Sequence, residues 1–337
     1  MSLRLALLCP GRGSYGREQL GSLPADSPVL DQLDAYRSSL GRPTLREMDG
    51  AERYSARLHV AGENASILTF GATLADLEAL DPNKGRLVCV AGNSMGWYTA
   101  LGASGALPLM EAARLVETMG SYQAGNVQGG QVLYPVTDAE WRRDPALEAH
   151  VMEALDWPGV ELSSRLGGTA VLAGPTEAVR RLLGELPKLQ RGPRSFPLQL
   201  PLHSAFHTSV MQAASQRARS ELADLDMRSP AIPLVDGLGR LHARWADPAL
   251  LLDYTLGAQV SQTFDLTACL HALLQDYAPD AVLLPGPGES LGGSVAQAMI
   301  EIGWRGLRDR QDFFEAQKSE HPVVISMCRP EQRALVA

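Results

Sequence analysis

The feature that most constrains the fold is an apolar run that ends at a serine between two glycines. Residues 87–91 read Leu-Val-Cys-Val-Ala, and Gly92-Asn-Ser-Met-Gly96 follows directly. A stretch rich in Ala and Leu comes next. This order predicts a buried strand, a sharp turn that carries Ser94, and a helix whose N-terminus faces the serine oxygen. The alternative is a tight turn with a purely structural role.

Strands and helices alternate along the rest of the chain. The predicted strands cover residues 3–9, 86–91, 131–136, 159–163, 168–173, 195–200, 232–235 and 280–284. The predicted helices cover residues 27–40, 44–58, 63–80, 96–104, 108–122, 138–155, 175–186, 208–224, 247–254, 262–276 and 290–301. The order strand-helix-strand-strand-helix-strand between 131 and 200 is typical of a ferredoxin-like module.

These patterns predict an α/β protein with an inserted module. We expect an α/β-hydrolase-like catalytic subdomain, with a parallel sheet and the serine turn, from residues 1–126 and 201–304. A ferredoxin-like subdomain is expected at 127–200. A C-terminal extension at 305–337 has no evident role.

Charge and cysteine usage exclude several classes of function. The net charge is −8, which disfavours nucleic acid as a partner. The four cysteines are far apart, so reduced thiols and a cytoplasmic location are expected. The first apolar stretch is too short for a signal peptide, and no apolar run approaches membrane-spanning length.

A serine nucleophile needs a base, and histidine is the usual one. His207 is the strongest candidate because it follows an extended apolar segment and begins a helix. His203 is a competitor. A metal site formed by the two is not expected, because the segment between them starts extended, beside Pro201. Five histidines lie in ordinary polar or helical contexts: His59, His150, His242, His271 and His321.

A glycine-rich turn follows the first predicted strand. Residues 11–16 match the dinucleotide pattern G-x-G-x-x-G. That fold also requires an acidic residue at the end of a second strand, whereas Asp31 and Asp34 lie in a helix-like segment. We therefore reject nucleotide binding, and no cofactor is expected. Backbone N–H groups of this turn could instead face the serine and bind an oxyanion.

Together these segments resemble the malonyl-CoA:acyl-carrier-protein transacylase family, which includes the acyltransferase domains of polyketide and fatty-acid synthases. The resemblance covers roughly residues 3–303 and includes the order and spacing of its motifs. The matching segments are Pro10-Gly-Arg-Gly-Ser14, Gly92-Asn-Ser-Met-Gly-Trp-Tyr-Thr-Ala-Leu101, Gly105-Ala-Leu-Pro-Leu109, Ala113-Arg-Leu-Val116, Ser204-Ala-Phe-His207 and Leu284-Pro-Gly-Pro-Gly288.

The resemblance implies a ping-pong acyl transfer. Ser94 would attack an acyl-CoA thioester with His207 as general base, and the backbone N–H groups of Met95 and Arg12 would hold the oxyanion. A backbone carbonyl, expected within residues 256–260, would orient the histidine. The acceptor would be the pantetheine thiol of an acyl carrier protein, the only implied protein partner, and a monomer is expected.

Three departures from the family pattern bear on the acyl group. Met119 replaces the arginine that binds the malonyl carboxylate, Asn93 replaces the histidine before the serine, and Trp97 replaces Glu or Gln. A buried carboxylate without its partner costs about 3–5 kcal/mol. We therefore expect an uncharged acyl group in a pocket that also includes Phe206. The alternative is malonyl transfer with Arg12 as the replacement cation.

Other functions remain open at this point. The same Ser94 and His207 could hydrolyse acyl groups from carrier proteins, as some relatives without the arginine do. A non-catalytic protein that docks a carrier protein is a further alternative, which the retained serine and histidine disfavour. An α/β-hydrolase esterase would need an acid between them, and Asp138 and Glu177 fall in the predicted insert.

Overall fold

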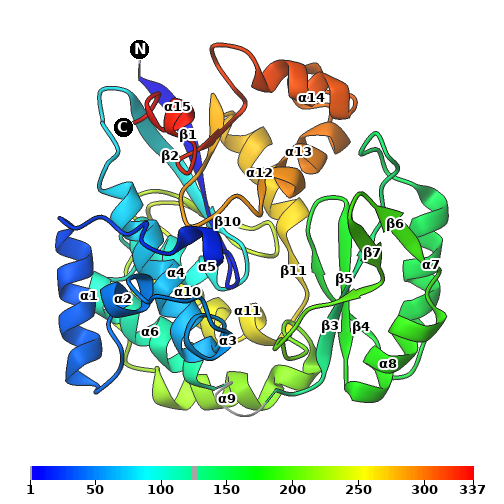
Figure 1. The fold of residues 1–337 in the computed structure, drawn as a ribbon, viewed down its shortest axis with the longest axis horizontal. Helices are drawn as coiled ribbons and strands as arrows, with labels where there is room; N and C mark the ends of the chain where they lie inside the picture. The colour runs from blue at the N-terminus through cyan, green and yellow to red at the C-terminus, as the bar shows by residue number, and fades with distance from the viewer. Residues whose placement is uncertain (1, 123–126) are drawn as a thin grey trace.

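The computed structural model describes residues 2–122 and 127–337. Two sheets lie side by side, and helices cover them (Figure 1). The helices are α1 (Pro28–Ser39), α2 (Leu45–Asp49), α3 (Ala56–His59), α4 (Gly62–Leu77), α5 (Gly96–Ala103), α6 (Leu109–Ser121), α7 (Pro145–Leu155), α8 (Thr176–Glu185), α9 (Gln212–Glu221), α10 (Pro248–Leu256), α11 (Ala258–Ser261), α12 (Leu266–Tyr277), α13 (Gly292–Glu301), α14 (Arg310–Gln317) and α15 (Pro330–Arg333).

The large sheet has the strand order β10-β9-β2-β1-β12-β13. Its strands are β1 (Leu3–Cys9), β2 (Gly85–Gly92), β9 (Leu234–Val235), β10 (Leu241–His242), β12 (Ala281–Leu284) and β13 (Val324–Ser326). All neighbouring pairs are parallel except β9 with β10. The first predicted strand, at residues 3–9, is one of the two central strands of this sheet.

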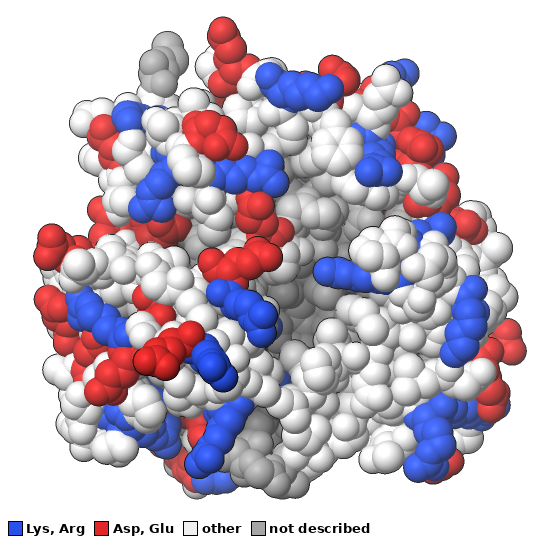
Figure 2. Space-filling view, in the orientation of Figure 1, with Lys and Arg blue, Asp and Glu red and all other residues white. Residues whose placement is uncertain are grey.

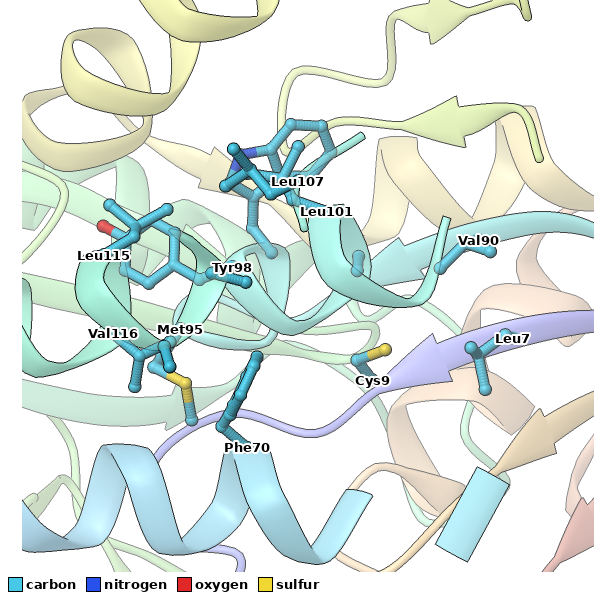
Figure 3. Packing of buried hydrophobic residues seen from close by; sticks show 14 of the residues in the cluster. Leu7, Cys9, Phe70, Val90, Met95, Tyr98, Leu101, Leu107, Leu115 and Val116 are labelled. Atoms are coloured by element: carbon cyan, nitrogen blue, oxygen red, sulfur yellow. The ribbon is translucent and has the colours of Figure 1, made fainter. Parts of the chain in front are cut away.

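Helices cover both faces of the large sheet, so β1 is apolar and buried over residues 5–9. Successive side chains of a strand point to opposite faces. Leu5, Leu7 and Cys9 accordingly join a core with α4, α5 and α6, whereas Ala6 and Leu8 join a core with α12 and α13. Figure 3 shows the first of these cores, in which Leu7 and Cys9 lie near Phe70 and Val90.

The second sheet has the order β11-β4-β5-β3-β8. Its strands are β3 (Gly130–Pro135), β4 (Glu161–Arg165), β5 (Thr169–Gly174), β8 (Leu198–Gln199) and β11 (Phe264–Asp265), and a separate hairpin pairs β6 (Leu189–Arg191) with β7 (Arg194–Phe196). One face packs against α7 and α8, which lie on the outer side of the molecule (Figure 1). The strand β11 comes from beyond the predicted insert at 127–200. The division into subdomains stays a prediction, and residue 126, where the first predicted segment ends, lies outside the described residues.

Several predicted elements differ in the structure. The helix predicted at 44–58 is two short helices, because Gly50 ends α2 and the Ser55 side chain caps α3. The helix predicted from 138 begins at Pro145, since Asp138 closes a turn by accepting the N–H groups of two following residues. The strand predicted at 195–200 is interrupted at Pro197, which has no N–H to donate.

The C-terminal segment 305–337 is built into the large sheet. β13 pairs with the edge of β12, in the register Leu283 to Ile325. Val336 is fully buried, and its carbonyl accepts the N–H of Asp81. This part of the chain therefore completes the large-sheet core. In the parts of the chain that the structure describes, no helix is long and apolar enough to cross a membrane.

Candidate active site

Ser94 lies in the sharp connection between β2 and α5. Its φ of 54° is left-handed, which is unusual for a residue with a Cβ. The flanking glycines allow this turn to approach its surroundings. A Cβ at Gly92 would lie 2.0 Å from the Gly96 carbonyl oxygen, and a Cβ at Gly96 would lie 2.3 Å from that of Cys9. Only glycine fits at these two positions without moving backbone.

His207 completes a hydrogen-bonded pair with the serine. The distance from Ser94 Oγ to His207 Nε2 is 2.8 Å, and His207 Nδ1 lies 2.8 Å from the carbonyl oxygen of Gln259. A carbonyl can only accept, so Nδ1 carries the proton and Nε2 accepts the serine hydroxyl. Gln259 falls within the segment 256–260 expected to supply this carbonyl. His207 also has a left-handed φ, 56°.

The electrostatics of the pair suit a base. Burial lowers the pKa of His207 to about 4, although the hydrogen bond to Gln259 opposes that shift. The imidazole is therefore neutral near pH 7 and able to take a proton. His203 lies nearby, but its Nδ1 contacts the Pro201 carbonyl. Among the described residues, no group of three or more His, Cys, Asp or Glu could hold a metal ion.

A cavity of about 510 Å³ holds the pair. Six of the other site candidates line it with Ser94 and His207: Arg12, Asn93, Met95, Met119, Phe206 and His203. Residues of β3 and β5, such as Leu133 and Val171, form another part of the wall. The cavity thus lies between the two sheets. Figure 2 shows the molecule hollowed between these two parts, with charged side chains of both signs around the hollow.

Trp97 does not lie where it was expected. Its side chain is fully buried and is not part of the cavity wall. The indole N–H donates to Thr255, 3.0 Å away, and the ring meets Tyr254 edge-on. Trp97 lies in the first turn of α5, and its side chain belongs to the core on that side of the large sheet. The expectation that it shapes an acyl pocket is at odds with this placement.

Arg12 contributes a cation to the cavity. Its guanidinium lies 5.0 Å above the centre of the Phe206 ring and donates to the Leu202 carbonyl at 3.3 Å. Burial lowers the pKa of Arg12 to about 10, so it stays charged at neutral pH. Within the described part of the chain, it is the only Arg, Lys, Asp or Glu that lines the cavity.

Sequence reasoning missed the side chain of Gln259. Its amide nitrogen donates to the Ser94 carbonyl at 2.8 Å, and its amide oxygen accepts the Tyr254 hydroxyl at 2.8 Å. A glutamine in an unremarkable segment carries no signal of such a role. Asn93 is a different case: its side-chain oxygen is buried with no hydrogen-bond partner among the described residues.

Known proteins resemble this chain in sequence and fold, although no protein-family model matches it. The malonyl CoA-acyl carrier protein transacylase of Salmonella typhimurium is 26% identical over 245 residues, which cover 70% of this chain and 74% of that protein. The polyketide biosynthesis protein ThaF of Burkholderia thailandensis is 29% identical over 163 residues, or 48% of this chain and only 13% of ThaF. The crystal structure of an acyl-carrier-protein S-malonyltransferase from Burkholderia pseudomallei has a TM-score of 0.74, at 24% identity and with 99% of both chains covered. The chain therefore shares the mixed α/β fold of that structure.

Proposed function

We infer that this chain belongs to the malonyl-CoA:acyl-carrier-protein transacylase family, which includes polyketide synthase acyltransferases, and that it transfers an acyl group from coenzyme A to an acyl carrier protein. The observation that carries this proposal is the 2.8 Å hydrogen bond between Ser94 and a neutral, buried His207. The relatives named above support it. The proposal needs no cofactor besides the acyl-CoA substrate.

In the first half-reaction, Ser94 Oγ attacks the thioester carbonyl while His207 Nε2 takes its proton. The Gln259 carbonyl stabilises the imidazolium that forms. The N–H groups of Arg12 and Met95 receive the oxyanion, because Met95 stands at the N-terminus of α5 and both residues line the cavity. The intermediate then expels coenzyme A, whose sulfur takes the proton from His207.

In the second half-reaction, the same residues act in reverse order. His207 removes the proton from the pantetheine thiol, whose sulfur attacks the acyl-serine carbonyl. Collapse of that intermediate returns the proton to Ser94 Oγ. We propose that the subdomain of residues 1–126 and 201–304 carries this chemistry, and that the insert at 127–200 supplies the opposite wall for the substrate.

We propose that the transferred acyl group is uncharged. Met119 lines the cavity from α6, where the family pattern has the arginine that pairs with a carboxylate. A thioether offers a flexible apolar surface and no charge. A carboxylate left without a cation there is disfavoured by about 3–5 kcal/mol, at least a hundredfold in rate.

A second candidate is transfer of a carboxylated acyl group, and the placement of Arg12 favours it. Arg12 lines the cavity, and its guanidinium stacks on the ring of Phe206, the residue before His207. This cation could pair with the carboxylate from a wall other than that of Met119.

Intact-protein mass spectrometry with acetyl-, butyryl- and malonyl-CoA separates the two candidates. For an uncharged substrate we expect acetyl or butyryl adducts that are absent in Ser94→Ala, and malonyl loading at least about a hundredfold slower. Met119→Arg should then reverse that preference. Efficient malonyl loading that is lost in Arg12→Gln, which keeps the backbone N–H, would establish the second candidate instead.

The acceptor is tested by adding a phosphopantetheinylated acyl carrier protein. Transfer predicts an acylated carrier protein as product. Release of free acid in its place would make the protein a hydrolase. Failure of every acyl-CoA and acyl-carrier donor to modify Ser94 would refute catalysis by this pair.

A further inference from the structure

Gln259 contacts both members of the Ser94–His207 pair. Its backbone carbonyl accepts His207 Nδ1–H, and its side-chain Nε2 donates to the Ser94 carbonyl, each at 2.8 Å. The residue is 2% exposed. The His207 side chain and the Ser94 backbone therefore meet at one residue, the first at its backbone carbonyl and the second at its side chain. The Gln259 side chain is thus placed to link the Ser94 turn to the residue that orients His207.

Tyr254 fixes which way the Gln259 amide points. The backbone N–H of Gly237 donates to the Tyr254 hydroxyl oxygen at 2.8 Å. A backbone N–H can only donate, so the hydroxyl hydrogen is directed elsewhere, to Gln259 Oε1 at 2.8 Å. With the amide oxygen facing Tyr254, the amide nitrogen faces the Ser94 carbonyl. A flipped amide would set its oxygen against the Ser94 carbonyl oxygen, and its N–H groups against the hydroxyl hydrogen of Tyr254.

The surroundings of Tyr254 hold its ring in place. Trp97 packs edge-on at 5.1 Å between ring centres, and the Arg240 guanidinium lies 5.0 Å from the Tyr254 ring centre. Gly237 allows the close approach, since a Cβ there would lie 2.8 Å from the Tyr254 hydroxyl oxygen. Burial raises the pKa of Tyr254 well above its ordinary value, so the hydroxyl stays a donor.

The need for such a clamp follows from backbone strain. Ser94 and His207 both hold left-handed φ angles, which disfavour residues that carry a Cβ. The Ser94 carbonyl accepts two hydrogen bonds, from Gln259 Nε2 and from the Trp97 N–H. Loss of the first leaves the Ser94 carbonyl with the Trp97 N–H as its one remaining donor among the described residues. Gln259 thus connects two strained residues that come from distant segments of the chain.

We propose that Tyr254 is a positioning residue for the Ser94–His207 pair, and that it acts by orienting the Gln259 amide. The inference rests on the proposed function, in which Ser94 is the nucleophile. Tyr254 itself touches neither reacting atom.

The test measures the reactivity of Ser94 directly, so it does not depend on knowing the acyl group. The rate of Ser94 modification by a fluorophosphonate is followed by intact-protein mass spectrometry. Tyr254→Phe should slow it by about tenfold, the rate equivalent of one buried hydrogen bond. Gln259→Met should slow it at least as much. The double variant should be no slower than Gln259→Met, because Tyr254 acts through Gln259.

The pH dependence adds a readout that a loss of stability alone would not give. Tyr254→Phe keeps the hydrogen bond between the Gln259 carbonyl and His207 Nδ1. The midpoint of the pH–rate profile should therefore be unchanged, whereas the maximal rate at its plateau should fall. The matched control is Tyr134→Phe, which removes another buried hydroxyl, one that donates to the Pro187 carbonyl away from the cavity. That variant should melt earlier and react at the unsubstituted rate.

Three outcomes would overturn the inference. Tyr254→Phe could react as fast as the unsubstituted protein, or its effect could add in full to that of Gln259→Met. Either result rejects the role of Tyr254 and leaves the proposed function intact. If Ser94 of the unsubstituted protein does not react at all, the proposed function fails and the inference fails with it.

Discussion

His207 couples burial to chemistry at the scale of single residues, and this predicts an unusual pH dependence. Burial lowers its pKa to about 4, and only the neutral imidazole can accept the Ser94 proton. We expect single-turnover acylation to lose rate as the pH falls through about 4, rather than through the usual histidine value near 6.5. The measurement is the acylation rate of Ser94 across the acidic range, and a midpoint near the usual value would contradict the prediction.

Single residues also show where sequence reasoning stops. Ser94 and His207 could be found because a strand, a glycine pair and a histidine after an extended segment are readable in the sequence. Trp97 was misplaced, since position after the serine does not reveal which face of α5 a side chain occupies. Gln259 was missed because its contacts join segments that only the folded chain brings together, with 165 positions between it and Ser94.

The turn between β2 and α5 makes a testable prediction at the scale of elements. Gly92→Ala and Gly96→Ala each place a Cβ within 2.0–2.3 Å of backbone atoms. We expect either variant to lose several kcal/mol of stability or to fail to fold, since backbone on both sides has to shift. Urea unfolding monitored by circular dichroism measures this.

Gly184→Ala is the matched control. Gly184 lies in α8, and nothing stands within 4 Å of the Cβ that alanine would add. Alanine is the better helix former, so this variant should be more stable by about 0.5–1 kcal/mol. Equal tolerance of alanine at Gly92 and Gly184 would show that the turn is not as tight as the structure indicates.

At this scale the sequence predicted most strands and long helices. The strands β1 and β2, for example, contain continuous apolar runs, at residues 5–9 and 87–91, that end at a proline or glycine turn. Boundaries were less predictable. Gly50 and Pro197 end elements through local backbone chemistry that competes with the apolar pattern. The pairing of β11 with β4 had no local signal, because two residues are too few to show a period.

The whole molecule depends on its last residues, although the sequence offered no role for them. Ile325 of β13 is 1% exposed, and β13 covers the edge of β12. Ending the chain at residue 304 should expose an apolar strand edge and cause aggregation. Ile325→Ala should lower the unfolding free energy by about 2–5 kcal/mol. The exposed Glu331→Ala is the control, expected to stay within about 0.5 kcal/mol.

The central position of β1 in the large sheet has a consequence for the synthesis of the protein. β1 is made before the other strands of its sheet, yet one of its two neighbours in that sheet, β12, begins only at residue 281. The carbonyl that sets the His207 tautomer is made 52 residues after the histidine and 165 after the serine. A nascent chain therefore carries an ordinary, unactivated hydroxyl until translation is well past residue 259.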